Sequence, residues 1–307
     1  MIRTGLVKIA AKCAVGLIIV FFLVRSVALN WTKVRGFDWS FDPALFALSC
    51  AVYCAAYAFL PWIWGRLLRS MGYRLSYPEL WHIYYIGNLG RYVPGKVWTI
   101  AGMAYMGGKA GIPSARAGAA AVFSQVYSLV SSVVIFLVFL ILREDSFPGP
   151  GRVGLMVLVF LAGAFVFVLF PRNVERMLNT VLGFMGRKPL EIGITTSSAV
   201  KIIVLYGLSW ILFGAAFHVL IVSIAGPGTV DLVFASGVWA AAYTVGFLAF
   251  FVPGGLGVRE GVIGLFFVHV LPVEVGIVIA GISRLVVTGI ELGCVFLSFL
   301  YRTLMER

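Results

Sequence analysis

Long apolar stretches, separated by short polar loops, make up most of this chain. Six of them lie at about 6–29, 43–65, 117–142, 153–171, 199–225 and 275–302. Each is close to or above the roughly 20 residues that an apolar helix needs to cross a bilayer. The pattern therefore predicts six membrane-spanning helices.

Two further apolar stretches, at 79–108 and 232–270, are interrupted near their middles. The first contains Arg91-Tyr92-Val93-Pro94-Gly95-Lys96, and the second contains Phe251-Val252-Pro253-Gly254-Gly255-Leu256-Gly257-Val258-Arg259-Glu260. Pro removes a backbone donor and Gly tolerates chain reversal, so both helices are predicted to break there. The predicted hinge positions are Pro94, Gly95, Pro253, Gly254, Gly255 and Gly257. Paired broken segments in two halves of a membrane protein indicate the binding site of a transporter.

Charge decides how the two interrupted stretches meet the membrane. The N-terminus, the loops at 66–78, 109–116 and 172–198, and the C-terminus are richest in Lys and Arg, whereas acidic residues balance the cations at 30–42 and 143–152. The positive-inside bias places the first group in the cytoplasm. This placement of the loops requires that the segment 79–108 enters and leaves the membrane from the cytoplasmic side. It also requires that the segment 232–270 enters and leaves it from the outside. Both termini are then cytoplasmic.

The resulting topology contains an inverted repeat. A first unit at about 43–142 and a second at about 199–302 each hold a span, a re-entrant hairpin and a span, in opposite orientations. We predict an all-α polytopic membrane protein with a single transmembrane domain over 1–307. Ten full spans would also leave the C-terminus inside, but irregular backbone at membrane depth has to be buried in protein or line a cavity, which favours re-entrance.

Composition excludes several classes of function. With 61% hydrophobic and 12% charged residues, the chain is not an ordinary soluble globule. The net charge of +12 comes from cations at the ends of apolar stretches, so a nucleic acid is not an expected partner. We recognise no catalytic constellation, metal-ligand spacing or cofactor motif and expect no enzyme. The first apolar stretch resembles a cleavable signal peptide, but Arg25 follows its core directly, which favours a retained helix.

Several polar residues lie within or beside the apolar segments. The candidate substrate-binding residues are Asn88, Arg91, Lys96, Arg259, Glu260, Arg284 and Glu291. A charge facing lipid at mid-span costs roughly 2.5–3.5 kcal/mol, so these side chains are expected to face inward. Internal ion pairs would then hold the hairpins. Alternatively, four cations against two carboxylates indicate a bound anion, and Arg suits phosphate geometry.

A row of small polar residues falls on one side of the stretch at 117–142. It comprises Ser124, Ser128, Ser131 and Ser132, with Gln125 beside them. Small hydroxyl residues of this kind either line a polar cavity or bring helices into close contact. Both interpretations remain open from the sequence.

The two interrupted motifs also carry a family resemblance. Asn88-x-x-Arg91-Tyr92-Val93-Pro94-Gly95-Lys96 and Pro253-Gly254-Gly255-x-Gly257-x-Arg259-Glu260-Gly261 resemble the membrane domain of lysylphosphatidylglycerol synthases, a flippase-like domain also found as stand-alone proteins. The likeness covers almost the whole chain and implies a lipid translocator. Stand-alone members are linked to polyprenyl-phosphate sugars and cell-envelope glycolipids. The soluble aminoacyl-transferase domain of the full synthases is not in this sequence, so their catalysis is not implied.

The expected function is therefore translocation of an anionic phospholipid or a polyprenyl-phosphate-linked lipid across the inner membrane. The membrane lipid is the expected partner, with its headgroup shielded in a basic cavity. The alternative is a non-transporting partner or regulator of a cell-envelope glycosyltransferase. A membrane-embedded transferase is the least supported, because acidic catalytic residues are scarce.

Overall fold

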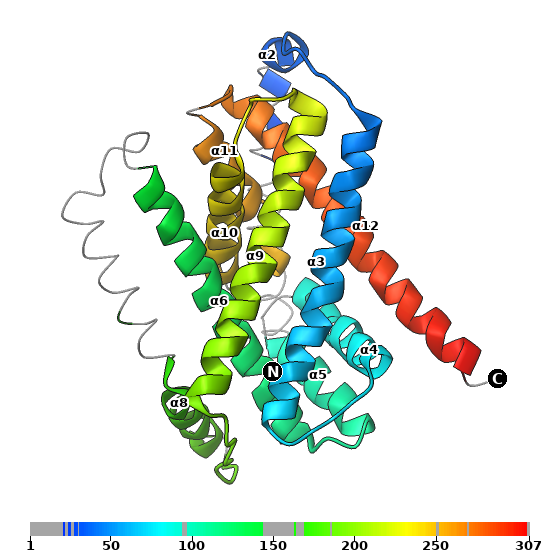
Figure 1. Cartoon of the computed structure of the whole chain (residues 1–307), viewed down its shortest axis with the longest axis vertical. Helices are drawn as coiled ribbons and strands as arrows, with labels where there is room; N and C mark the ends of the chain where they lie inside the picture. The colour runs from blue at the N-terminus through cyan, green and yellow to red at the C-terminus, as the bar shows by residue number, and fades with distance from the viewer. Residues whose placement is uncertain are drawn as a thin grey trace, which may run out of the picture.

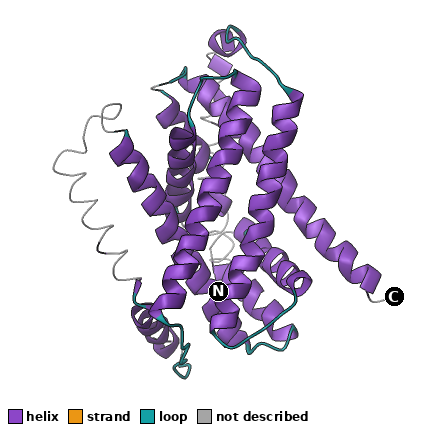
Figure 2. Ribbon diagram, in the orientation of Figure 1, coloured by secondary structure: helices purple, strands orange, loops and turns teal. Residues whose placement is uncertain are grey.

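Helices form the described part of the chain. The computed structural model describes residues 21, 24–25, 28–29, 31–93, 97–143, 163, 169–184, 186–249, 252–268 and 270–305. The helices are α2 (Trp31–Arg35), α3 (Pro43–Ser70), α4 (Tyr77–Asn88), α5 (Val97–Lys109), α6 (Ser114–Leu142), α8 (Pro171–Phe184), α9 (Thr196–Ala225), α10 (Leu232–Leu248), α11 (Val258–Phe267) and α12 (Val273–Met305), with 3-10 turns η1 (Leu89–Tyr92) and η2 (Pro253–Gly255). Short loops join many of them, and no strand occurs among these residues (Figure 2).

Four of these helices are long and apolar enough to cross a membrane: α3, α6, α9 and α12. They coincide with the spans predicted at 43–65, 117–142, 199–225 and 275–302. The shorter helix α10 is also apolar. The chain is thus an all-helical, multi-pass membrane protein. The spans predicted at 6–29 and 153–171 fall largely outside the described residues.

Both predicted breaks interrupt helices. In the first segment α4 ends at Asn88, η1 follows, and α5 begins at Val97; in the second α10 ends at Leu248 and α11 begins at Val258. Gly254, Gly255 and Gly257 have φ angles of 58°, 68° and 77°. Glycine adopts this left-handed region without a steric penalty, so these residues allow the chain to turn. The hinge residues Pro94 and Gly95 lie outside the described residues.

The two broken segments approach the centre of the bundle from opposite ends. In Figure 1, α3 runs down to the lower end, where α4 and α5 attach, whereas α9 runs up to the upper end, where α10 and α11 attach. Within each segment the two helices pack against each other, and η1 contacts η2. The two breaks therefore meet inside the bundle.

Side-chain caps fix where three of the helices begin. Asp42 accepts hydrogen bonds from the backbone N–H groups of Ala44 and Leu45 at 2.8 and 3.0 Å, and Asp231 accepts one from Phe234 at 2.8 Å. Ser76 starts α4 with a capping box. Such caps satisfy N–H groups that have no partner within the helix.

Glycines let the two helices of the first hairpin pack closely. A Cβ added at Gly87 would lie 2.8 Å from the backbone nitrogen of Met103, and one at Gly102 would lie 2.7 Å from the carbonyl oxygen of Gly87. These contacts involve backbone atoms, which cannot move aside without shifting a helix. Small residues commonly permit this kind of approach between membrane helices.

Replacement of Gly87 by alanine will therefore destabilise the hairpin. Overpacking of this kind costs about 1–3 kcal/mol. Gly281→Ala is the matched control, since a Cβ at Gly281 meets nothing within 4 Å. Thermal unfolding of the purified protein in detergent will show a lower midpoint for Gly87→Ala and an unchanged or higher one for the control. Equal midpoints would contradict close packing of α4 on α5.

Candidate functional site: a cationic cavity between the two breaks

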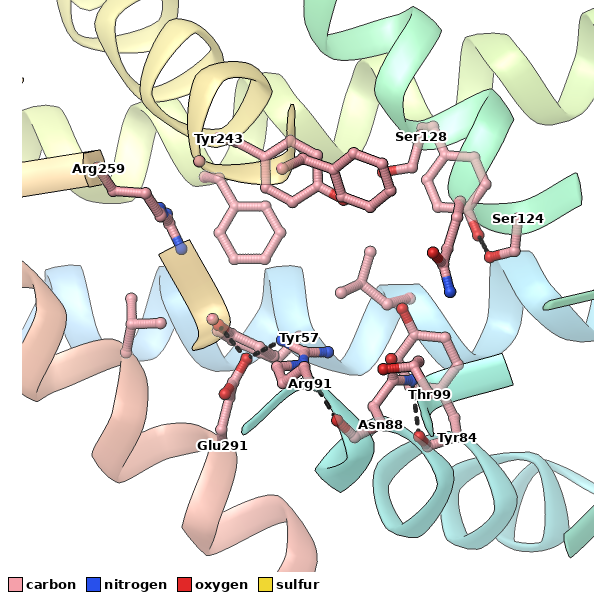
Figure 3. Close-up of a pocket in the computed structure, with 18 of the residues that line it drawn as sticks. Tyr57, Tyr84, Asn88, Arg91, Thr99, Ser124, Ser128, Tyr243, Arg259 and Glu291 are labelled. Atoms are coloured by element: carbon pink, nitrogen blue, oxygen red, sulfur yellow. Dashed lines mark hydrogen bonds and ion pairs between the residues drawn. The ribbon is translucent and has the colours of Figure 1, made fainter. Parts of the chain in front are cut away.

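A cavity of about 180 Å³ adjoins both breaks, with Arg91 and Tyr92 of η1 and Gly254 of η2 in its wall (Figure 3). A single buried water needs roughly 10–15 Å³ measured in the same way, so the space holds a group of many atoms. The lining comes from α3, α4, η1, α5, α6, α9, α10, η2, α11 and α12. Both halves of the molecule thus contribute to one site.

Glu291 of α12 binds the first break. Its Oε1 accepts hydrogen bonds from Arg91 Nη1 at 2.5 Å and from the Tyr57 hydroxyl at 3.0 Å, and its Oε2 accepts one from the Tyr92 hydroxyl. Arg91 Nε also donates to the carbonyl oxygen of Asn88 at 3.3 Å. The carboxylate is buried but has donors at both oxygens, as a buried charge requires. These contacts tie η1 to α12 and α3.

Arg284 of α12 binds the second break. Its Nη2 donates to the carbonyl oxygen of Gly254 at 3.2 Å, and its Nε lies 3.8 Å from Glu260 Oε1. Arg284 and Glu291 are seven residues apart on the same helix, about two turns. One helix therefore holds both breaks, each through a different charge.

Arg259 has a different environment. Its guanidinium carbon lies 5.1 Å from the centroid of the Trp239 ring, a cation–π distance. Within the described part of the chain, no carboxylate lies within 4.0 Å of it. Gly246 makes room for its side chain, since a Cβ there would lie 2.5 Å from Arg259 Cγ. Because Glu291 faces Arg91 and Glu260 faces Arg284, Arg259 carries the charge that these pairs leave over among the described candidate residues.

The structure brings together most of the residues proposed from sequence. Asn88, Arg91, Arg259, Arg284 and Glu291 all line the cavity. Asn88 donates from its side-chain amide to the Tyr84 carbonyl oxygen at 2.7 Å. The sixth residue, Glu260, is buried and faces Arg284 instead of lining the cavity, and its Oε2 has no hydrogen-bond partner among the described residues. The seventh, Lys96, lies outside the described residues.

The row of serines divides between the two interpretations. Ser124, Gln125 and Ser128 line the cavity. Ser131 instead donates to the Ile203 carbonyl oxygen of α9 at 2.7 Å, and Ser132 lies 2.9 Å from the Thr244 hydroxyl of α10. Ser124 and Ser128 thus face the site, whereas Ser131 and Ser132 bind α6 to α9 and α10.

Aromatic residues form a large share of the wall, although none of them was among the binding residues predicted from the sequence. They include Tyr57, Tyr84, Tyr92, Tyr206, Trp210, Phe213, Trp239 and Tyr243. Several of these residues lie in helices whose sequences resemble ordinary apolar membrane spans. A tyrosine in mid-span was the available signal, because its hydroxyl needs a polar partner when buried.

The arrangement suits the binding of an anion. Three guanidinium groups surround space that is shielded by aromatic rings, and guanidinium matches carboxylate or phosphate oxygens in pairs. No group of three or more His, Cys, Asp or Glu side chains occurs among the described residues to hold a metal ion.

Comparison with known proteins gives the family. No curated protein matches the chain. The family model described as the lysylphosphatidylglycerol synthase TM region matches residues 9–291, which include both breaks and every residue that lines the cavity. The match spans nearly the whole sequence and agrees with the resemblance carried by the two motifs, so the chain belongs to the lysylphosphatidylglycerol synthase TM region family.

Proposed function

We propose that the protein is a lipid translocase that moves an anionic phospholipid or a polyprenyl-phosphate-linked lipid between the leaflets of the cytoplasmic membrane. The observation that carries the proposal is Arg259, a cation without a carboxylate partner among the described residues, in a cavity where two broken helices meet. Membership of the family supports a role with membrane lipids. In this role the chain binds and moves its substrate without chemical change.

The surroundings of Arg259 favour a phosphate headgroup. Charges attract more strongly where aromatic side chains replace water, because the local dielectric constant is lower. Arg259 lies in the first turn of α11, whose backbone N–H groups add positive potential. The hydrocarbon chains of the lipid stay in the bilayer, since the outer face of α12 exposes apolar side chains such as Leu285, Leu292 and Phe296.

The proposed mechanism uses the topology predicted from charge. It has six full spans, two re-entrant hairpins and an inverted repeat, with units at about 43–142 and 199–302 and both termini in the cytoplasm. The attachment of α4 and α5 at one end of the bundle and of α10 and α11 at the other supports it (Figure 1). So does the basic helix α8, with Arg172 and Arg176, at the same end as α4 and α5.

Cysteine labelling tests this topology. Single cysteines at Lys109, at the end of α5, and at Pro272, just before α12, are introduced after the four native cysteines are replaced. Both native side chains are exposed. An impermeant maleimide will label position 109 only from the cytoplasm and position 272 only from outside. Labelling of both positions from one side would contradict the inverted repeat.

Reconstitution tests the function itself. The protein is placed in liposomes with a fluorescent phosphatidylglycerol or a fluorescent polyprenyl phosphosugar, and the label in the outer leaflet is reduced by dithionite. Translocation exposes all of the label to reduction, whereas protein-free liposomes protect about half. Protection equal to that of protein-free liposomes with both lipids would exclude translocation of these classes. That result would favour the alternative role as a partner of an envelope glycosyltransferase.

A further inference from the structure

The cavity has two chemically different ends. In Figure 3, Arg259, Arg91 and Glu291 lie toward one side, whereas Thr99, Ser124 and Ser128 lie toward the other. The lining at the second side comes from α4, α5, α6 and α9 and carries hydroxyl, amide and aromatic groups. Among the described charged residues of the lining, Arg91, Arg259 and Glu291 lie toward the first side in Figure 3, and Arg284 binds Gly254 and Glu260 at the second break. We call the second side the neutral end.

Three polar groups of the neutral end have no hydrogen bond to another described residue: the Thr99 hydroxyl, the Gln125 amide and the Tyr84 hydroxyl. Two neighbouring polar groups do have hydrogen-bond partners within the protein. The Asn88 amide donates to the Tyr84 carbonyl oxygen, and the Ser124 hydroxyl is hydrogen-bonded to the Tyr206 hydroxyl. All three residues line the cavity, so a ligand there can supply the hydrogen bonds that these groups do not make within the protein. These groups are therefore available to a ligand.

The chemistry of these groups defines the ligand that fits them. A hydroxyl and a primary amide each both donate and accept hydrogen bonds, which matches the hydroxyl groups of a polyol. The ring of Trp210 on α9, whose centroid lies 4.3 Å from that of Tyr243 on α10, adds an apolar wall for its carbon atoms. An ammonium group would find no carboxylate here, since Glu291, the acidic residue in the lining, lies at the other end and binds Arg91.

We propose that the headgroup continues beyond its phosphate as a neutral polyol, either glycerol or a hexose, held by Thr99, Gln125 and Tyr84 while Arg259 holds the phosphate. This inference rests on the proposed function and narrows its substrate class. A site built to hydrogen-bond a hydroxyl discriminates against an analogue that lacks it, because its own polar groups are then left without partners.

Competition binding tests the inference with lipids matched in charge. Native mass spectrometry of the purified protein compares phosphatidylglycerol with phosphatidylmethanol, which carries the same single phosphodiester charge but no free hydroxyl. A second arm compares a polyprenyl phosphohexose with the polyprenyl methyl phosphate diester. The wild-type protein will prefer the polyol lipid by about tenfold in at least one arm, as expected for one or two neutral hydrogen bonds.

Variants locate the preference in the cavity. Thr99→Val with Gln125→Leu will bring the ratio close to one. Tyr84→Phe, which removes a single hydroxyl and no volume of the ring, will lower the ratio by a smaller factor and serves if the double variant fails to fold. Thr303→Val, at an exposed threonine of α12, is the control and will keep the wild-type ratio.

Each outcome has one meaning. A preference for the polyol lipid in the first arm alone identifies glycerol, and a preference in the second arm alone identifies a hexose. Either result supports the inference. Equal binding in both arms, or a preference that survives in the double variant and in Tyr84→Phe, overturns the inference and leaves translocation of anionic lipids intact. Failure of the wild-type protein to bind any of the four lipids contradicts the proposed function itself.

Discussion

Arg259→Ala will reduce lipid transport in proteoliposomes to near the rate of protein-free liposomes. Hydrogen bonds to a charged group contribute about 1.5–3 kcal/mol, so the loss will be at least tenfold. The folded protein will remain, because Arg259 has no carboxylate partner among the described residues that its removal would leave as a buried, unpaired charge. Dithionite protection at matched protein levels measures the effect.

Two further variants show whether the effect is specific. Arg259→Lys will rescue only part of the rate, because a point charge does not reproduce the paired donors of guanidinium. Arg69→Ala removes an exposed cation near the end of α3 and will leave transport unchanged. Full transport by Arg259→Ala would place the headgroup elsewhere in the molecule.

The sequence could predict the four long helices and both breaks because their signals are local. Apolar length is read within one segment, and Pro or Gly acts on the backbone at its own position. The glycines at 254, 255 and 257 illustrate this, since all three have positive φ.

The sequence could not predict which charges pair. Arg284 and Glu291 share a face of α12, which suggests a common environment, yet each binds a different break. The partner of Glu291 is Arg91, and that of Arg284 is Glu260 on the preceding helix. These pairings depend on how distant segments fold back on one another. Nothing near Glu291 in the sequence specifies a partner 200 residues away.

The aromatic wall and the divided row of serines escaped prediction for a related reason. In a membrane helix the side facing lipid and the side facing a cavity are both rich in apolar residues, so periodicity separates them poorly. Trp210 and Phe213 read as span residues, although both line the cavity. Only the packing of α6 against α9 and α10 decides that Ser128 faces the site and Ser131 does not.

Arg91→Gln will lower the free energy of unfolding of the protein by about 3 kcal/mol, near the lower end for a broken buried ion pair. The lower end applies because the Arg91 side chain is 34% exposed, while that of Glu291 is 12% exposed. Removal of the cation leaves Glu291 with the Tyr57 and Tyr92 hydroxyls as its donors in the cavity wall. Unfolding in mixed micelles measures the loss. Arg69→Gln is the control, since Arg69 is exposed and forms no ion pair within the described part of the chain, and a surface substitution of this kind changes stability by about 0.5 kcal/mol or less.

A double variant at positions 91 and 291 tests whether the lost stability comes from the unpaired charge of Glu291 or from the lost hydrogen bonds. Arg91→Gln with Glu291→Gln will recover much of the lost stability, because the amide that replaces Glu291 can accept from one tyrosine hydroxyl and donate to the other, and no unpaired charge is buried. The exchanged pair, Arg91→Glu with Glu291→Arg, will recover less, since the Tyr57 and Tyr92 hydroxyls can accept from the guanidinium group but their own protons then lose the carboxylate acceptor. Full recovery by the exchanged pair would mean that attraction between the two charges alone holds the first break to α12. The tyrosines would then be dispensable, and Tyr57→Phe would be as stable as the wild-type protein.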